Sequence, residues 1–398
     1  MAYTKVKPLM VASFPSSRLT GAFGAISGAN LTGLGDGIDT KDASNDPTIS
    51  TNPATGVGTV WLNKSTGELF GCVDATAGAN VWANIGAGLD NVYGWHGKQH
   101  GYSAGSRGGT PTNGLQRFAF ASGTQDAGDI GDMTGTRGNG GAWSSLTHGY
   151  CVGGYKGGPA TDAIEKFTFS AASISTDVGN LTLYRVYPGG YHDATRGIGY
   201  ICGGSGAAGK FSTQEKYNFD SSVNSYITSS LTIEREAPAT TQTVTSGYAI
   251  GGHILNTTPQ NSIEKTSFAS DTVSTYSGTL INASGTSIVV RHPTAVASLT
   301  HFYVCGGYAN LIAHKDDIQK FSFSSESSGT DIANLTSGNK TNAGSSSSTT
   351  AGYVIAGEGT SLNKSIDRIN FASDTTIVDS GDLVDATGRN SAIRGFQV

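Results

Sequence analysis

Six basic residues recur at regular intervals in the C-terminal three quarters of the chain. Each follows the tyrosine of a repeated segment by 35 to 43 residues, and the six are Arg137, Arg185, Arg235, Arg291, Lys340 and Arg389. If the repeats surround an axis, these cations ring one mouth of a channel and favour an anionic ligand. Alternatively, each side chain donates hydrogen bonds to loop carbonyls of the neighbouring repeat, since an arginine carries five N–H donors. Repetition in every unit favours this structural alternative.

Aromatic side chains in the most variable loops are the second candidates for binding. These loops span residues 155–162, 205–213, 253–261 and 308–315, and two of them begin with Tyr155 and Tyr308. Variable loops on a rigid scaffold are where recognition is usually built. The two rings either stack on a sugar or fill a protein pocket, or they only cover the rim of the fold.

The residue types that catalysis and metal binding require do not converge. His96 and His100 stand four apart, a spacing that suits zinc on one face of a helix, but here they flank Gly97-Lys-Gln99 between predicted strands. The adjacent Asp316 and Asp317 are expected in a solvated loop and not as a glycosidase pair. We therefore expect no enzyme activity, no metal and no cofactor.

The elements that position these residues come from a unit that appears six times. Its first mark is a strand that begins with a tyrosine and ends in small residues, and the tyrosines are Tyr102, Tyr150, Tyr200, Tyr248, Tyr303 and Tyr353, spaced by 48, 50, 48, 55 and 50 residues. The second mark is a strand such as Ile164-Glu-Lys-Phe167 or Ile318-Gln-Lys-Phe321. A third strand follows, as in Asp177-Val-Gly-Asn-Leu-Thr182. A strand before the tyrosine strand completes a unit of four.

A period near 50 residues with double glycines, as in Gly153-Gly154 and Gly203-Gly204, resembles the kelch repeat. The resemblance covers residues 91–398 and implies a six-bladed kelch-like β-propeller. Kelch-type copper oxidases need a convergent Tyr, His and Tyr–Cys set, and we find no such set. Sialidase propellers carry Asp-box turns, which are absent here. A glycan-acting kelch enzyme is therefore the least favoured alternative.

The ring of blades must also close. Alignment of Arg389 with Arg137 lays residues 391–398 over residues 139–146, which precede the strand of Tyr150. We predict that this tail supplies the first strand of the first blade, beside residues 102–105, and so removes a free sheet edge. The segment 92–96 is the rival for this position.

Composition sets the class of protein. Glycine occupies 57 positions and charged residues make up only 14% of the chain, a balance that suits short strands and tight turns. The net charge of −5 argues against a general nucleic-acid binder, and no apolar run is long enough to span a bilayer. No signal peptide is predicted at the N-terminus. Cys151, Cys202 and Cys305 fall at equivalent points of three repeats, so they are expected to be free and buried.

The N-terminal quarter stands outside the repeat. Residues 1–50 are poor in apolar periodicity and are similar to the extended stretches of tailed-phage tail fibres, whose chains usually trimerise. Residues 51–90 contain a stretch, 58–85, that resembles a small β-meander of such fibres, with a hairpin turn at Lys64-Ser-Thr-Gly67 and a miniature core of Trp61 and Trp82.

These resemblances together favour an all-β tail fibre or spike protein of a tailed phage, of the marine cyanophage kind. They imply a virion protein assembled in the host cytoplasm, which docks to other virion proteins through residues 1–90. The propeller, residues 91–398, would contact a host-surface glycan or protein. A purely structural collar, nozzle or decoration component is the alternative. A homo-oligomer, a trimer by analogy with such fibres, is the expected assembly.

Overall fold

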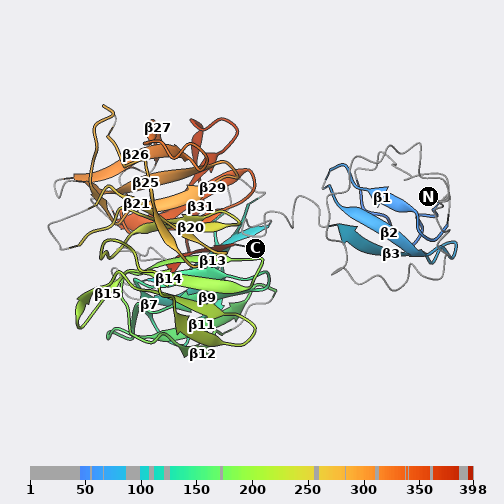
Figure 1. Ribbon diagram of the computed structural model, residues 1–398, viewed down its shortest axis with the longest axis horizontal. Helices are drawn as coiled ribbons and strands as arrows, with labels where there is room; N and C mark the ends of the chain where they lie inside the picture. The colour runs from blue at the N-terminus through green and yellow to red at the C-terminus, as the bar shows by residue number, and fades with distance from the viewer. Residues whose placement is uncertain are drawn as a thin grey trace, which may run out of the picture. The chain divides into compact units, whose positions relative to one another are not determined.

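The computed structural model describes residues 45–53, 56–65, 67–86, 99–106, 112–120, 126–170, 174–254, 260–282, 284–309, 313–336, 338, 340–358, 362–384 and 393–397. Within these ranges the regular elements are all strands, so the predicted all-β class is confirmed (Figure 1). The chain divides into two compact units, one within residues 1–92 and one within residues 93–398. The predicted extended segment 1–50 lies mostly outside the described residues.

The first unit contains the predicted meander. Its sheet has the order β1 (Val60–Leu62), β2 (Leu69–Asp74), β3 (Val81–Gly86). Gly67 takes the left-handed conformation in the first hairpin, with φ of 75°, which glycine reaches without steric cost. The rings of Trp61 and Trp82 lie edge to face, with centroids 5.9 Å apart.

Within its described residues the second unit contains six antiparallel sheets of four or five strands, which we number in chain order by their tyrosine strand. Sheet 1 is β32 (Ile393–Gln397), β4 (His100–Ser106), β5 (Thr112–Ala119) and β6 (Gly128–Asp132). Sheet 2 is β8 (Gly141–Ser144), β9 (His148–Val152), β11 (Ala163–Thr168) and β12 (Thr176–Asn180). Sheet 3 is β13 (Gly189–Asp193), β14 (Ile198–Cys202), β17 (Gln214–Asn218) and β18 (Val223–Tyr226).

The remaining sheets repeat this order. Sheet 4 is β19 (Ala239–Gln242), β20 (Ser246–Ile250), β21 (Ile263–Ser267) and β22 (Val273–Tyr276). Sheet 5 is β24 (Thr294–Ala297), β25 (His301–Ala309), β26 (Ala313–Ser322) and β27 (Thr330–Asn334), with β23 (Val290–Arg291) also paired to β25. Sheet 6 is β28 (Gly344–Ser347), β29 (Ala351–Glu358), β30 (Leu362–Asn370) and β31 (Ile377–Asp382).

The sequence marks fall on the strands predicted for them. Each tyrosine lies in the second strand of its sheet and each Ile-Glu-Lys-Phe type segment in the third, as in the pair Tyr150–Lys166 between β9 and β11. Two short ladders lie beside these sheets. They are β7 (Arg137–Gly138) with β10 (Tyr155–Lys156), and β15 (Ser205–Gly206) with β16 (Gly209–Lys210).

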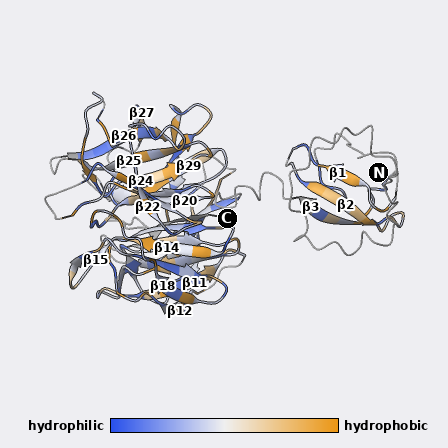
Figure 2. Cartoon of the chain, in the orientation of Figure 1, coloured by the Kyte–Doolittle hydropathy of each residue, from blue (hydrophilic) through white to orange (hydrophobic). Residues whose placement is uncertain are grey.

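The core lies between neighbouring sheets. Trp143 and Tyr150 of sheet 2 pack with Ile201 and Tyr217 of sheet 3 in one buried cluster. Equivalent clusters join sheets 5 and 6, and sheets 6 and 1. Central strands such as β14 are accordingly hydrophobic (Figure 2). A sheet with two apolar faces needs a neighbour on each side, which is why one repeat does not suffice for stability.

The C-terminal strand belongs to the first sheet, as predicted. β32 pairs with β4 in the register Ile393–Ala104, Phe396–Tyr102 and Gln397–Gly101. The tail and not the segment 92–96 therefore covers this edge of β4. The side chains of β32 lie outside the described part of the structure.

The first strands of the six sheets contact one another in cyclic order. β32 lies next to β8, and the contacts continue through β13, β19, β24 and β28 back to β32. The double glycines of sheets 2 to 5 allow the chain to pass closely at these steps. Gly153 has a φ of 61°, and a Cβ there would lie 2.7 Å from the carbonyl oxygen of Arg185 at the entry to the next sheet. Any larger residue would collide with that backbone.

The predicted fate of the cysteines is confirmed. Cys151, Cys202 and Cys305 are free and buried, as is Cys72 of the first unit.

Candidate functional site

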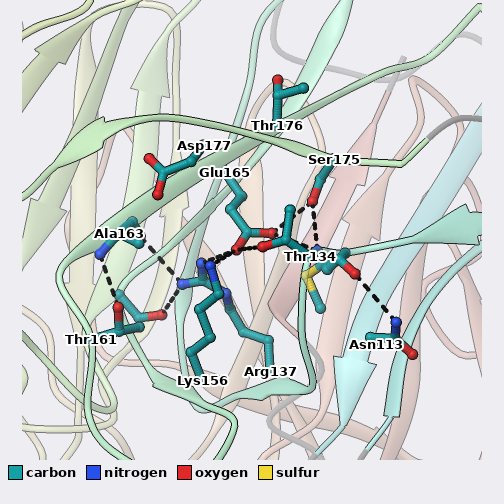
Figure 3. Close-up of polar contacts among 12 residues, drawn as sticks. Asn113, Thr134, Arg137, Lys156, Thr161, Ala163, Glu165, Ser175, Thr176 and Asp177 are labelled. Atoms are coloured by element: carbon teal, nitrogen blue, oxygen red, sulfur yellow. Dashed lines mark hydrogen bonds and ion pairs between the residues drawn. The ribbon is translucent and has the colours of Figure 1, made fainter.

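The first of the six recurring cations lies in a buried cluster between sheets 1 and 2 (Figure 3). One guanidinium nitrogen of Arg137 lies 2.8 Å from Oε1 of Glu165, and both side chains are fully buried. A second nitrogen donates to the carbonyl oxygens of Gly153, at 2.7 Å, and Ala163, at 3.2 Å. The cation thus ties the segment that enters sheet 2 to the strands of that sheet.

Glu165 also has partners from the preceding sheet and from its own. The hydroxyl of Thr134, just after β6, donates to its Oε1 at 2.6 Å, and Ser175 donates to its Oε2 at 2.6 Å. Lys156 adds a second ion pair at 2.7 Å. Burial alone would raise the pKa of Glu165, but the Arg137 charge and these donors lower the pKa to about 2, so the carboxylate is ionised at neutral pH.

The same arrangement recurs at three further entries into a sheet. We call it the joint, and each joint contains a threonine from the end of one sheet with a cation and an acid that belong to the next. The four joints are Thr134–Arg137–Glu165, Thr182–Arg185–Glu215, Thr232–Arg235–Glu264 and Thr336–Lys340–Asp367. Their cation–carboxylate distances are 2.8, 2.7, 2.6 and 2.9 Å.

Two entries use a neutral amide in place of the acid. In sheet 5, Gln319 occupies the acid position and its Oε1 accepts from the backbone N–H of Ile281 at 2.8 Å. In sheet 1, Gln116 accepts in the same way from Val384 at 2.7 Å. The cation of sheet 5, Arg291, stacks on the ring of Tyr308 with its guanidinium 4.4 Å from the centroid. Arg389 lies outside the described residues.

These positions bear directly on the predicted ligand residues. Arg137, Arg185, Arg235 and Lys340 are buried with carboxylate partners and do not present their charges to solvent. This geometry is that of the structural alternative. The carbonyl oxygens to which each cation donates belong to the sheet that follows it in the chain. Tyr155 and Tyr308 are half-buried, and each pairs its backbone with the cation segment, at Gly138 and Arg291 respectively.

Other candidates are also placed by the structure. The expectation that Asp316 and Asp317 lie in a loop is wrong: both belong to β26, because the third strand of sheet 5 is longer than its counterparts in sheets 2 to 4. Burial raises the pKa of Asp317. His100 lies in β4 and His96 lies outside the described residues. The described side chains include no cluster of three or more His, Cys, Asp or Glu suited to a metal ion.

A second set of ion pairs joins neighbouring sheets near the turns between third and fourth strands. We call these the clasps. In each, the lysine of a third strand binds an acid in the next sheet: Lys216–Asp271 at 2.5 Å, Lys265–Glu326 at 3.3 Å, and Lys320–Asp374. Two tyrosine hydroxyls also hydrogen-bond to the clasp acids: Tyr200 donates to Asp271 and Tyr303 donates to Asp374.

Sheets 2 and 3 enclose a hollow where the corresponding clasp would be. It has a volume of about 360 Å³ and is open to solvent on one side. Its lining includes Leu146, Thr147, His148, Lys166, Phe219 and Asp220. None of the ion pairs found within the described residues includes Lys166.

No protein-family model matches the chain, and no curated protein matches it. Within the described ranges, no helical segment has the length and apolarity that a membrane crossing requires.

The hollow and the predicted binding loops lie at opposite ends of the sheets. The predicted binding loops follow the second strands, whereas the hollow lies at the turns that join first to second and third to fourth strands. The sequence does contain one sign that sheet 3 lacks a clasp acid. Six positions after the third-strand lysine or arginine, sheets 4, 5 and 6 carry Asp271, Glu326 and Asp374, but sheet 3 carries Ser222.

Proposed function

We propose that this chain is a non-enzymatic structural protein of a tailed-phage particle, a tail fibre or spike whose C-terminal unit is a six-bladed kelch-like β-propeller. The observation that carries the propeller is the cyclic contact order of the six first strands, together with the pairing of β32 to β4. A C-terminal strand in the first sheet fastens such a ring and leaves no open edge there.

The first unit supports the assignment to a particle. The three-stranded sheet β1–β2–β3 has the hairpin and the tryptophan pair expected of the small meander of phage fibres. We therefore propose that residues 1–90 dock to other virion proteins and that the propeller faces outward, in a homo-oligomer such as a trimer.

The charged residues support a non-enzymatic role. Four of the six recurring cations are accounted for by the joints between sheets, where their charges hold buried carboxylates. A purely structural collar or nozzle component is the alternative. The hollow between sheets 2 and 3 favours host contact over this alternative, because it offers charged groups and an aromatic ring at an open site.

Truncation tests the roles proposed for residues 1–90 and for the second unit. A chain that begins at Asn91 should fold, with a far-UV spectrum free of substantial helix, but should not be incorporated into particles during assembly in infected cells. The full-length chain, supplied in the same way, is the control. Incorporation of the truncated chain, or its failure to fold, would contradict the proposed roles of the two parts.

A further inference from the structure

The clasps define what is missing between sheets 2 and 3. The acid of each clasp stands six positions after the third-strand lysine or arginine of its own sheet and takes the left-handed conformation, with φ of 55° at Asp271, 48° at Glu326 and 58° at Asp374. Ser222 occupies this position in sheet 3, with φ of 57°. Ser222 therefore takes the same left-handed conformation as the clasp acids but offers no carboxylate at this position.

Lys166 is the cation that this carboxylate would hold. It occupies the third-strand position of Lys216, Lys265 and Lys320 and is half-buried. In the next interface the space is also filled by Arg196, which donates to the hydroxyl of Tyr200 at 3.0 Å. The matching turn of sheet 2 is the shorter Ser145-Leu-Thr147, so the hollow has no such filling.

The remaining walls are suited to a hydroxylated ring. Phe219 is half-buried and stacks on Tyr150, with centroids 4.5 Å apart, and Leu146 is exposed beside it. Thr147 and Asp220 supply a hydroxyl and a carboxylate. Burial, aided by the Lys166 charge, lowers the pKa of His148, so its imidazole is neutral at neutral pH. Pockets of this size, with an apolar wall and few polar groups, typically hold small ligands.

We propose that the hollow binds a hexuronic acid residue of a surface polysaccharide. Its carboxylate pairs with Lys166, in the role that Asp271, Glu326 and Asp374 have in the other interfaces. The C–H face of its ring packs against Phe219 and Leu146, and its hydroxyls donate to Asp220. This inference rests on the proposed function and names the ligand class that such an adhesion protein would use.

Titration of the full-length protein with methyl glucuronide and methyl galacturonide, by ligand-observed NMR, tests the inference. Methyl glucoside and methyl galactoside are the matched neutral probes, and acetate is the carboxylate alone. At least one uronide should bind about tenfold or more tightly than its neutral counterpart and than acetate. The reason is that its carboxylate forms a hydrogen-bonded ion pair with Lys166. Equal binding of acid and neutral sugars, or binding of neither uronide, would overturn the inference.

Three variants assign the effect to this site. Lys166→Gln should remove the preference for the uronide at an unchanged melting temperature. Ser222→Asp should rebuild the clasp, abolish uronide binding and raise the melting temperature. Lys216→Gln, the same change in a closed clasp, should keep the affinity and lower the melting temperature slightly, since half-exposed ion pairs contribute little. Uronide affinity that survives both Lys166→Gln and Ser222→Asp places the ligand elsewhere and overturns the inference.

The two proposals fail in different ways. If purified protein shows no uronide preference but the chain is found on particles, the ligand assignment is wrong and the proposed function stands. If the chain is not a particle component, the proposed function fails whatever the purified protein binds.

Discussion

At the scale of single residues, four of the six cations that suggested an anion site are partners of buried acids. Arg137 and Glu165 are distant from water, and each satisfies the charge of the other. Removal of one partner of such a pair leaves an uncompensated buried charge, which costs more than the pair itself contributes. The joints are consequently the places where small changes have the largest effect on folding.

Arg137→Gln should therefore destabilise the protein by about 3 kcal/mol, the lower end of the cost of breaking a buried ion pair, because Lys156 keeps its ion pair with Glu165. Arg291→Gln is the matched control, because the acid position of its sheet holds the neutral Gln319. Its cost should be smaller than that of Arg137→Gln, since a cation–π contact contributes about 1 kcal/mol. Denaturant unfolding of both variants measures the difference. Equal, small losses of unfolding free energy in the two variants would favour the anion-binding interpretation of Arg137.

Acid should weaken the joints. The pKa of Glu165 is lowered from the ordinary 4.5 to about 2, so its ionised form stabilises the fold above about pH 5, and this contribution is lost as the pH falls toward 2. In Glu165→Gln the loss is already present at neutral pH, so the melting temperature should fall less between pH 5 and pH 2 than in the natural protein. The exposed Glu234, changed to Gln, is the control and should follow the natural protein. Parallel curves for all three proteins would refute a charged Glu165 in the joint.

At the scale of elements, the closing strand joins the two ends of the second unit. β32 covers β4, which would otherwise present unpaired N–H and C=O groups to solvent. Alignment predicted this pairing because the cation of each repeat fixes where the next first strand begins. It did not predict the joints, since Arg137 and Glu165 meet only through the register of β11 against β9 and the path of the entering segment.

Deletion of residues 391–398 should lower the melting temperature by many degrees. Trimming a frayed terminus usually costs little, but this deletion removes a whole strand of sheet 1. Replacement of the same eight residues by a Gly/Ser stretch of equal length is a useful second variant, because it retains chain length and removes the strand-forming residues. An unchanged melting temperature in the deletion would show that the tail does not close the ring.

At the scale of the whole molecule, the repeat made six sheets predictable but did not predict the hollow between sheets 2 and 3. Tyr150, Tyr200 and their counterparts mark second strands wherever the repeat occurs, so the architecture follows from periodicity. A site that arises where one repeat departs from the others follows instead from differences, such as Ser222 in place of an acid. Whether that difference opens a hollow depends on the packing of two sheets, which the sequence does not state.

Electron microscopy of purified particles labelled with an antibody against the second unit tests the proposed function most directly. We predict that the label marks a projecting tail fibre or spike at its outward end, away from the point of attachment. Fab fragments of the same antibody should then block adsorption to host cells. Label on a collar or nozzle, with adsorption unaffected, would favour the purely structural alternative. Particles that carry no label, although they bind other virion-specific antibodies, would contradict the account.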